Sequence, residues 1–491
     1  MSSQLPGISL SALLADLPVS DAIPDRSIQR LVLDARQVAR GDAFVAVKGH
    51  ARHGLEFIAQ AEARGAAVVI HDGLHEGGID TDLPLVSCRG LADALPVLAQ
   101  RRWGDPAQAL DLVAVTGTNG KTSVAWLLSQ ALGGAMIGTL GVGRPGQQVA
   151  SSHTTPDIFS VYDQLHALSR AGQRCVVMEA SSHALDQRRL AGLRFTSVIF
   201  TTLGHDHLDY HRDRASYARA KARLFRDFAS DRQIINLDDA FGQVLAAELG
   251  EGGGRVTVAT RRDLDADLRA ELIEASSDGL RTRLHWPARE RTIEVTAPLL
   301  GEINLYNLMI IAAELSARGR SRQDIVETLS TLEPVPGRMQ GHLVPDGPLA
   351  VIDYAHTPDA LEAALKSLQA LEPDQLWCVF GCGGDRDATK RPIMGRIAES
   401  LADRVVLTND NPRHENARSI VRAIQGGMRK PERAMIEFDR ARAIEHALGQ
   451  AEPGDVVLIA GKGHETEQIV GDSHLAFSDL DVVQQWQGAT A

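Results

Sequence analysis

Several features that would assign this sequence to an exported, membrane-spanning or disulfide-bonded class are missing from it. Only four cysteines occur among 491 residues, too few for a disulfide framework, and reduced thiols fit the cytosol. No apolar run approaches the roughly 20 residues that a bilayer-spanning helix needs. The first segment, MSSQLPGISLSALLADLPVSD, lacks the basic start and apolar core of an export signal. The sequence therefore predicts a cytoplasmic protein without a membrane span.

The sequence also carries fewer positive than negative side chains, 51 Lys and Arg against 63 Asp and Glu. The formal net charge is −12, whereas general nucleic-acid binders are normally basic, so we expect no nucleic-acid partner. An acidic chain can hold an anionic substrate only through local cations, helix N-termini and metal ions.

The cysteines do not follow the pattern of a zinc site. Cys378 and Cys382 lie in WCVFGCGG, with neither a histidine nor a second cysteine pair nearby. These two residues are therefore expected to be small, buried apolar side chains.

What the sequence does contain is a repeated alternation of apolar runs and helical patterns. This alternation predicts an α/β fold whose largely parallel sheets are covered by helices on both faces. The polar segment RRWGDPAQALD and the segment EPVPGRMQG at 333–341 have the composition of boundaries or linkers. We therefore expect three domains, at residues 1–106, 107–334 and 335–491.

The expected elements can be given by residue range. The first domain is a small α/β unit with a helix at 55–64. In the second domain, strands are expected at 112–116, 175–180, 197–202, 233–237, 255–260, 280–286 and 291–297, with helices at 216–228 and 304–318. In the third, strands at 349–356, 376–381, 404–410 and 455–463 alternate with helices at 358–370, 390–402 and 416–428, which is typical of a doubly wound unit.

The segment LVAVTGTNGKTSVAWLL, residues 112–128, combines a strand, a glycine turn and a helical pattern. Gly117 and Gly120 allow close backbone approach, and amides at a helix N-terminus attract phosphate oxygens. Lys121 would neutralise the outer phosphates, and Thr122 would supply a hydroxyl for Mg²⁺. The loop is shortened, because Val115 stands where a phosphate-binding loop usually has its first glycine. The order of elements nevertheless favours ATP binding over a plain strand-to-helix turn.

A second cluster is VMEASSHALDQRRL, in which Glu179 ends an apolar strand. A buried lone carboxylate is unfavourable unless it meets a cation, and Mg²⁺ prefers hard oxygen ligands. A Mg²⁺ ligand is therefore the favoured interpretation; the alternative is a solvated strand end.

Two further polar segments accompany these clusters. TLGHDHLDYHRD contains six Asp and His residues between 205 and 213, but their spacing fits no zinc site; His207 could lie near Mg²⁺-bound phosphate. In SSHTTPD, Thr154 and Thr155 could contact a polar substrate, or the segment could simply cap the helix expected near Asp157.

In the third domain, polar loops follow four expected strands: DYAHTPDA, GCGGDRDATKRP, TNDNPRHE and AGKGHE. Loops at the carboxyl ends of parallel strands meet at one edge of a sheet. Arg386 and Arg413 could each bind a carboxylate through two parallel hydrogen bonds.

Taken together, GTNGKT, MEASSHAL, HDHLDYH, DYAHTPDAL, GCGGDRD, DNPR and GKGHE resemble the Mur ligase family of peptidoglycan synthesis. The resemblance runs from about residue 30 to 470, and within the family it is greatest to the branch that adds meso-diaminopimelate. A shortened glycine loop is normal in this family. The resemblance implies a domain for the uridine nucleotide, a central parallel-sheet P-loop ATPase domain and a C-terminal Rossmann-like domain. We expect a monomer.

The resemblance assigns roles to residues that match the family's motifs. The ATP positions are Gly117, Thr118, Asn119, Gly120, Lys121, Thr122, Ser123, Asn304, Arg338, Asp353 and His356. The UDP-substrate positions are Leu33, Ala35, His50, Ala51, Arg52, Thr154, Thr155, Ser181, Gln187 and Arg189. The amino-acid positions are Arg386, Asp410, Asn411, Pro412, Arg413, Gly461 and Glu465. The Mg²⁺ positions are Thr122, Glu179, His207 and Lys221, and the catalytic residues are Lys121, Lys221 and His207.

Three of these positions carry a further expectation. Lys221 matches a lysine that the family carbamylates, a reaction that needs the neutral amine. Ala35 stands in LDAR where relatives often have LDSR, which removes one hydrogen bond to the uridine part. His153 stands where relatives can carry Asn, and no role is assigned to it.

The implied reaction is ATP-dependent formation of an amide bond. The D-glutamate carboxylate of UDP-N-acetylmuramoyl-L-alanyl-D-glutamate attacks the γ-phosphorus of ATP. The amine of meso-diaminopimelate then attacks the resulting acyl phosphate. No nucleophile elbow, Ser–His–Asp set or activated cysteine is evident, which argues against an intermediate attached to the enzyme.

Rival interpretations remain. The nearest are a lysine-adding Mur ligase and a folylpolyglutamate synthase, against which the DNPR loop argues. A phosphate-loop ATPase or switch would hydrolyse ATP without an amino acid, and a nucleotide-binding scaffold would consume none.

Overall fold

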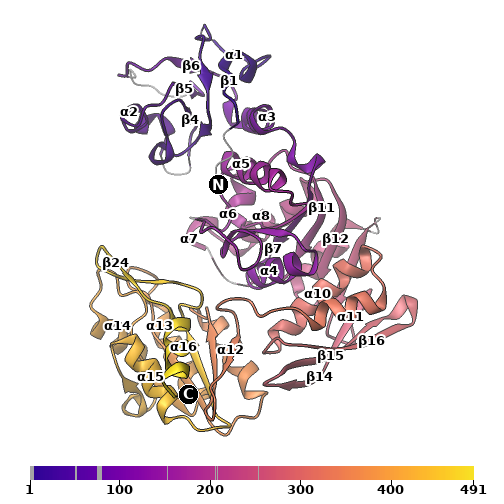
Figure 1. The fold of residues 1–491 in the computed structure, drawn as a ribbon, viewed down its shortest axis with the longest axis vertical. Helices are drawn as coiled ribbons and strands as arrows, with labels where there is room; N and C mark the ends of the chain where they lie inside the picture. Colours follow the sequence, from indigo (N-terminus) through magenta and orange to yellow (C-terminus); the bar gives the residue numbers. More distant parts are fainter. Residues whose placement is uncertain are drawn as a thin grey trace. The chain divides into compact units, whose positions relative to one another are not determined.

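The protein is described by a computed structural model that covers residues 5–20, 22–49, 52–73, 80–151, 153–204, 206, 208–250, 252 and 254–490. The chain forms two compact units, which divide between Arg255 and Val256 (Figure 1). Within the described residues, no helix combines the length and the apolar character that crossing a membrane requires. All four cysteines are buried and unpaired, so the prediction for Cys378 and Cys382 is confirmed.

The first unit begins with a small parallel sheet. Its strands are β3 (Leu31–Val32), β4 (Ala43–Ala46), β5 (Val68–His71) and β6 (Leu85–Ser87), in that order. The helix expected at 55–64 is a 3-10 turn, η2 (Gly54–Phe57), followed by α2 (Ile58–Ala63). A longer helix, α3 (Leu91–Trp103), leads toward the next sheet, and Trp103 Nε1 donates to Asp163 at 2.8 Å.

A second sheet of the first unit carries the glycine loop. Its strands, in spatial order, are β12 (Ser230–Asn236), β11 (Phe195–Phe200), β7 (Asp111–Thr116), β10 (Cys175–Glu179), β8 (Ala135–Gly138) and β9 (Gly141–Gly143). The pairs of β7 with β10 and β11, of β10 with β8, and of β11 with β12 are parallel, and only β9 runs antiparallel to its neighbour. Because β10 is in register with β7, Glu179 lies beside Val115, immediately before the loop.

Helices connect these strands, as the alternation predicts. They are α4 (Lys121–Ala131), α5 (Ile158–Arg170), α6 (Ser182–Asp186), α7 (Leu208–His211), α8 (Arg214–Arg226) and α9 (Ala240–Leu249). Asp157 accepts from the backbone N–H groups of Phe159 and Ser160, so it caps α5 in the way that the capping alternative describes.

The second unit begins with strands that differ from the expected parallel pattern. From β13 (Arg255–Ala259), which starts at the division between the units, the order continues through β14 (Leu268–Ser276), β15 (Gly279–Trp286) and β16 (Arg291–Ala297). Strands β14, β15 and β16 are antiparallel. Only Ser277 and Asp278 separate β14 from β15, and so short a connection can join only antiparallel strands. Helices α10 (Ile303–Ala317) and α11 (Arg322–Ser330) follow.

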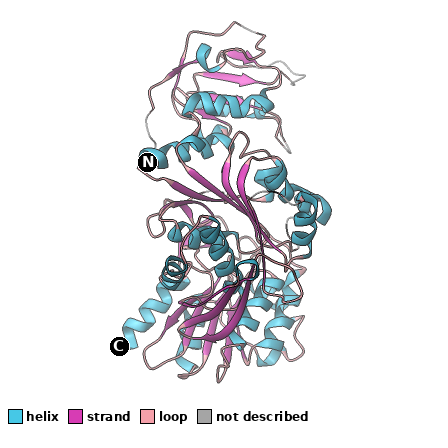
Figure 2. Cartoon of the chain, turned by 90° about the vertical axis from the view of Figure 1, so that its right-hand side faces the viewer, coloured by secondary structure: helices cyan, strands magenta, loops and turns pink. Residues whose placement is uncertain are grey.

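The remainder of the second unit is the doubly wound fold that the sequence predicts. The sheet order is β17 (Gln340–Leu343), β18 (Leu349–Asp353), β22 (Val456–Ala460), β19 (Leu376–Phe380), β20 (Arg404–Leu407) and β21 (Met435–Ile436), and only β17 is antiparallel. Helices lie on both faces of this sheet (Figure 2). The hairpin β23 (Glu467–Val470) and β24 (Ser473–Ala476) lies outside it.

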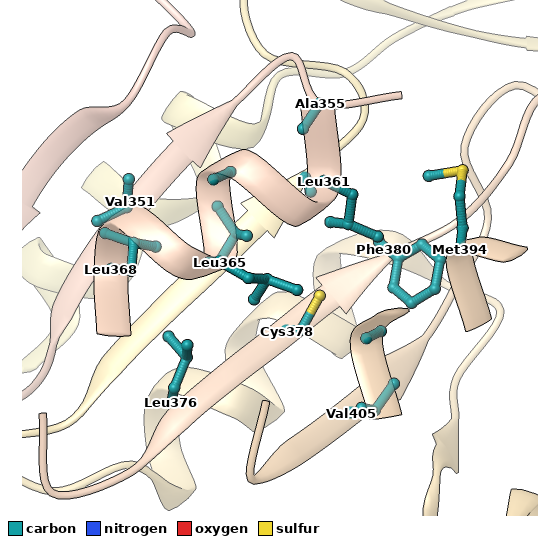
Figure 3. Close-up of a cluster of buried hydrophobic side chains, with 14 of the residues drawn as sticks. Val351, Ala355, Leu361, Leu365, Leu368, Leu376, Cys378, Phe380, Met394 and Val405 are labelled. Carbon is teal, nitrogen blue, oxygen red and sulfur yellow. The ribbon is translucent and has the colours of Figure 1, made fainter. Parts of the chain in front are cut away.

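Side chains alternate between two cores across this sheet, because successive strand residues point to opposite faces. On one face, Val351, Cys378 and Phe380 pack against α12 (Pro358–Gln369), α13 (Lys390–Leu401) and α14 (Ala417–Gln425) (Figure 3). On the other face, Ile352 and Val379 pack against α15 (Arg440–Gln450) and α16 (Asp479–Thr490). The two cores fix the carboxyl ends of the strands, from which the polar loops start.

Candidate functional site

The glycine loop runs from the end of β7 to the start of α4, as predicted. Gly117 has φ +155° and Gly120 has φ +83°. A Cβ atom at residue 117 would lie 1.8 Å from Thr201 Oγ1, so only glycine fits there. The backbone therefore passes directly against Thr201, which follows β11, and Lys121 begins the helix.

Contacts from the segment after β11 hold the loop in place. The Thr118 N–H donates to the Thr202 carbonyl at 2.7 Å, and Thr201 Oγ1 donates to the Asn119 carbonyl at 2.6 Å. Thr118 Oγ1 accepts from Gly204 N at 2.8 Å and lies 3.0 Å from the Tyr217 hydroxyl. Lys121 Nζ folds over the turn and donates to the carbonyls of Gly117 and Thr118, both at 2.9 Å. A positive charge thus lies where a phosphate loop needs one.

Glu179 is completely buried, so the alternative of a solvated strand end is wrong. Its Oε2 accepts from Thr122 Oγ1 at 2.9 Å, and its Oε1 accepts from the Thr139 backbone N–H at 2.7 Å. Within the described residues, no Lys, Arg or His forms an ion pair with this carboxylate. Gly138 leaves space beside it, because a Cβ at that position would lie 2.3 Å from Oε1.

These surroundings fit a magnesium ion. A buried carboxylate without a protein cation is unfavourable, and Mg²⁺ binds through one or two carboxylates together with substrate phosphates. In the part of the chain that the structure describes, no group of three or more His, Cys, Asp and Glu residues could hold a metal on its own. Glu179 and Thr122 therefore fit an ion shared with phosphate oxygens better than a closed protein site.

Lys221, on α8, is buried next to the loop. Its side chain is 1% exposed, and Nζ donates to the Gly117 carbonyl at 2.7 Å. Nζ also lies 4.4 Å from the centre of the Tyr217 ring. Burial, together with the nearby charge of Lys121, lowers the pKa of Lys221 well below its usual value. The neutral amine is therefore favoured in the folded protein.

The five predicted UDP-substrate residues between 154 and 189 form one hydrogen-bonded group. Arg189 donates to the Thr155 carbonyl at 2.6 Å and to Gln187 Oε1 at 2.7 Å. Thr155 Oγ1 donates to the Glu179 carbonyl at 2.6 Å and accepts from the Ser181 N–H. Thr154 Oγ1 lies 3.0 Å from Thr139 Oγ1, which links it to the Glu179 region.

The predicted residues near the N-terminus are only partly described. Ala35 is buried at the start of a 3-10 turn, and Leu33 is half-buried before it. Arg52 is exposed, with Nε donating to Glu56 at 2.8 Å. His50, Ala51 and His207 lie outside the described residues.

The remaining predicted ATP residues belong to the second unit. Arg338 lies over the Tyr354 ring, 4.5 Å from its centre, and burial raises the pKa of Asp353, which accepts from the Met339 N–H at 2.7 Å. His356 Nδ1 lies 2.8 Å from the Tyr354 carbonyl, and burial lowers its pKa. Asn304 is buried on α10 and donates to the Leu300 carbonyl at 2.7 Å. Three of these four predicted residues therefore meet around Tyr354.

The predicted amino-acid residues lie together where β19, β20 and β22 end. Arg413 Nη1 donates to the Gly384 carbonyl at 2.9 Å, and a Cβ at Gly383 would lie 2.9 Å from that nitrogen and 3.8 Å from Arg386 Cγ. The two arginines therefore meet over the loop after β19.

The acidic and amide groups of this site lie on the loops after β20 and β22. Asn411 Nδ2 donates to Glu465 Oε2 at 2.9 Å. Gly461, with φ +116°, approaches Asp410, since a Cβ there would lie 2.6 Å from Asp410 Oδ2. Pro412 is buried between Asn411 and Arg413. The two arginines thus lie beside Asn411, whose amide binds the Glu465 carboxylate, an arrangement that suits a zwitterion.

Comparisons with known proteins give the same picture. Residues 27–97 match the Mur ligase family, catalytic domain; residues 115–315 match the Mur ligase middle domain; and residues 337–463 match the Mur ligase, glutamate ligase domain. A curated protein of Xanthomonas campestris pv. campestris (strain 8004), named UDP-N-acetylmuramoyl-L-alanyl-D-glutamate--2,6-diaminopimelate ligase, is 43% identical over 484 residues, 97% of this chain and 97% of that protein. The chain belongs to the Mur ligase family.

Other members of the family support the assignment. A Pseudomonas aeruginosa protein with the same name is 43% identical over 94% of this chain and 95% of its own length. A solved structure of a UDP-N-acetylmuramoyl-L-alanyl-D-glutamate--2,6-diaminopimelate ligase is 32% identical, with a TM-score of 0.69, and covers 99% of each chain. The predicted family and fold class are therefore confirmed. Members of the family are ATP-dependent ligases that form amide bonds, and so is this chain.

Three residues of this Mur ligase site were not predicted from the sequence. Thr139 contacts Glu179 through its backbone N–H, Tyr217 contacts Thr118, and Lys462 contacts Asn411 and Glu465. Thr139 and Tyr217 lie outside the recognised motifs, so no sequence signal identified them. Lys462 lies inside GKGHE, and its position between Gly461 and Glu465 was the available signal.

Proposed function

We propose that this Mur ligase joins meso-diaminopimelate to UDP-N-acetylmuramoyl-L-alanyl-D-glutamate, with ATP as the energy source, in peptidoglycan synthesis. The observation that carries this proposal is the near full-length similarity to relatives with that name, at 43% identity. The amino-acid loops agree with it, because Arg386 and Arg413 lie beside Asn411, whose amide binds Glu465.

In the first step, a carboxylate of the D-glutamyl residue attacks the γ-phosphorus of ATP. A P–O bond forms to the carboxylate while the bond to the β-phosphate oxygen breaks, giving an acyl phosphate and ADP. Lys121 and the amides of the glycine loop stabilise the negative charge on the transferred group. By family resemblance, the γ-carboxylate is the one that reacts.

In the second step, the amine of the incoming amino acid attacks the acyl carbon. The tetrahedral intermediate expels inorganic phosphate, and the nitrogen loses a proton as the amide forms. Water must be excluded from the acyl phosphate, because hydrolysis would waste it.

Magnesium would be held by Glu179, Thr122 and a carbamate on Lys221, where it would screen phosphate charge and align the reacting oxygens. Support for the carbamate comes from the lowered pKa of Lys221, since the neutral amine is the form that reacts with carbon dioxide. His207 is proposed as a further ligand by family resemblance alone.

Selection of the amino acid is assigned to the guanidinium groups. Diaminopimelate has a carboxylate at its far end, and lysine has none. A partly buried guanidinium left without that carboxylate would disfavour lysine. Asp410, Asn411, Gly461 and Glu465 suit the far ammonium group.

The remaining assignments are proposed on family resemblance. The UDP-linked substrate is contacted by Leu33, Ala35, Arg52, Thr154, Thr155, Ser181, Gln187 and Arg189. ATP is contacted by Asn304, Arg338, Asp353 and His356. We further propose domains at 1–106, 107–334 and 335–491, a monomeric state, and a cytoplasmic location, where ATP is available.

The test is a phosphate-release assay with ATP, Mg²⁺ and the UDP-muramoyl dipeptide. We expect phosphate and a ligated product with meso-diaminopimelate and little of either with lysine. Efficient use of lysine would favour the lysine-adding alternative, and use of a folate with glutamate would favour a folylpolyglutamate synthase. ATP hydrolysis that is indifferent to the amino acid would contradict ligation altogether.

A further inference from the structure

A buried lysine links two of the loops that form the proposed amino-acid site. The side chain of Lys462, just after β22, is completely buried. Its Nζ donates to Asn411 Oδ1 at 3.1 Å, to Glu465 Oε2 at 2.8 Å and to the Glu467 carbonyl at 2.6 Å. An ammonium group has three N–H donors. All the donors of Lys462 are therefore engaged within the chain, which makes it a support for the site and not a ligand of the substrate.

Lys462 fixes the orientation of the Asn411 amide. Asn411 Oδ1 accepts from Lys462 and from the Ile469 N–H at 3.0 Å, while Nδ2 donates to Glu465 Oε2 at 2.9 Å. A flipped amide would turn its NH₂ group toward two other donors and its oxygen toward a carboxylate. Only one orientation satisfies all three neighbours.

The same contacts leave one oxygen of Glu465 available. Oε2 accepts from both Lys462 and Asn411, whereas Oε1 accepts no hydrogen bond from any residue that the structure describes. The Glu465 side chain is 29% exposed. Glu465 thus presents a single, oriented acceptor atom at the site.

We propose that Lys462 is a positioning residue that determines the preference for an amino acid with an ammonium group at its far end. This inference rests on the proposed function. By binding Oε2 and orienting Asn411, Lys462 directs Oε1 of Glu465 toward the incoming ammonium group. Its positive charge also compensates the carboxylate while the site is empty.

The experiment compares two amino acids in the full-length enzyme and in the variant Lys462→Met. The second amino acid is 2-aminopimelate, which differs from diaminopimelate only in lacking the far amino group. For the variant, we expect the KM for diaminopimelate to rise about tenfold, the usual scale for losing a hydrogen bond to a charged group. The monoamino analogue should keep nearly the same KM, or the same inhibition constant where its turnover is slow, and the KM for ATP should also change little.

A general loss of packing would weaken the binding of both amino acids equally. Such an equal rise in the two constants would overturn the proposal. The matched control is Lys366→Met, which removes an exposed lysine paired with Glu362 at 2.5 Å; it should leave both constants unchanged. Lys462→Gln keeps two N–H donors, so the preference should fall by a smaller factor. If thermal unfolding shows that Lys462→Met does not fold, the same comparison of the two amino acids in Lys462→Gln tests the proposal. Failure of the unaltered enzyme to use diaminopimelate would contradict the proposed function instead.

Discussion

At the scale of single residues, Lys221 shows how burial can change the protonation state that the folded protein favours. The amine lies between the glycine loop and the Tyr217 ring, and both its burial and the charge of Lys121 oppose protonation. A protonated lysine would repel Lys121 in the same small space. The folded state therefore favours the amine that a carbamate requires.

This burial gives a pH-dependent contribution to stability. In the unfolded chain Lys221 keeps its proton up to a pH near its usual pKa, whereas in the folded chain it loses the proton at lower pH. Between these two values the unfolded state binds more protons, so stability rises with pH. In CO₂-free buffer, the Tm of the unaltered protein should therefore increase relative to that of Lys221→Met as the pH rises toward the usual pKa of a lysine. A difference that is independent of pH, as expected for Lys366→Met, would contradict the neutral amine.

Arg413 provides a second prediction at this scale. The change Arg413→Ala removes a half-buried guanidinium from the proposed far-carboxylate site. We expect the KM for diaminopimelate to rise by about 100-fold, as for the loss of a two-pronged charged contact, while the KM for ATP stays unchanged. The control Arg418→Ala removes an exposed guanidinium from the helix that follows. Equal KM values in Arg413→Ala and in the unaltered enzyme would dismiss the assignment.

The sequence predicted those site residues whose chemistry is visible in one local motif. Gly117, Lys121 and Glu179 could be identified because a strand, a turn and a helix give them a context. Thr139 and Tyr217 could not, because their contacts to Glu179 and Thr118 arise only when distant segments pack together. Thr139, moreover, contributes its backbone N–H, which no side-chain pattern reveals.

At the scale of elements, a buried ion pair joins the two helices on one face of the doubly wound sheet. Arg440, at the start of α15, binds both carboxylate oxygens of Asp479, at the start of α16, at 2.7 and 2.8 Å. Arg440 also donates to the carbonyls of Asn409 and Ala460, which precede the amino-acid loops. One side chain therefore ties two helices to two strand ends.

Breaking this pair should be strongly destabilising. The change Arg440→Met leaves Asp479 charged in a buried position, and we expect a loss of about 3–5 kcal/mol in the free energy of unfolding. The double variant Arg440→Met/Asp479→Leu should recover most of it, because no buried charge remains. Urea unfolding, followed by tryptophan fluorescence, measures the free energy of unfolding of the single and the double variant. The exposed Arg442→Met is the control. A double variant no more stable than the single one would show that the ion pair itself is not the cause.

The central strands of the doubly wound sheet and helices α12, α13 and α14 were predicted because the strands are continuous apolar runs and the helices are amphipathic. The edge strands β17 and β21 and helices α15 and α16 were not predicted. In the antiparallel part of the other sheet, the strands expected at 280–286 and 291–297 match β15 and β16, whereas β14 was not predicted. In β14 only Leu268 and Ala270 are buried, and the strand carries Arg269, Glu271 and Glu274, so it does not form an apolar run. Its partner strands supply the pairing that its own composition does not indicate.

At the scale of the whole molecule, the segment 333–341 has the composition of a linker but is packed within the second unit. Within 333–341, Val335 and Met339 are almost fully buried, and a Cβ at Gly337 would lie 2.2 Å from the His464 backbone nitrogen. Proline and glycine there serve close packing as well as chain reversal. Composition predicted the position of the segment, but its burial depends on loops more than 100 residues away.

We therefore expect limited trypsin digestion of the native protein to spare the bond after Arg338. Met339, on the other side of that bond, is held by its N–H bond to Asp353, and a protease needs an extended, accessible segment. Intact-mass analysis of the early fragments identifies the bonds that trypsin cuts first. A first cut at Arg338 would indicate that the segment is open in solution.

The burial of every cysteine has a practical consequence. Burial raises the pKa of Cys378 and of Cys382 to about 12, so reactive thiolate is scarce at neutral pH. Cysteines introduced at Val149 and Leu475, which are 63% and 50% exposed, would then react with maleimide dyes ahead of the native thiols. These two positions belong to different units, so energy transfer between the dyes would follow the distance between the units during turnover.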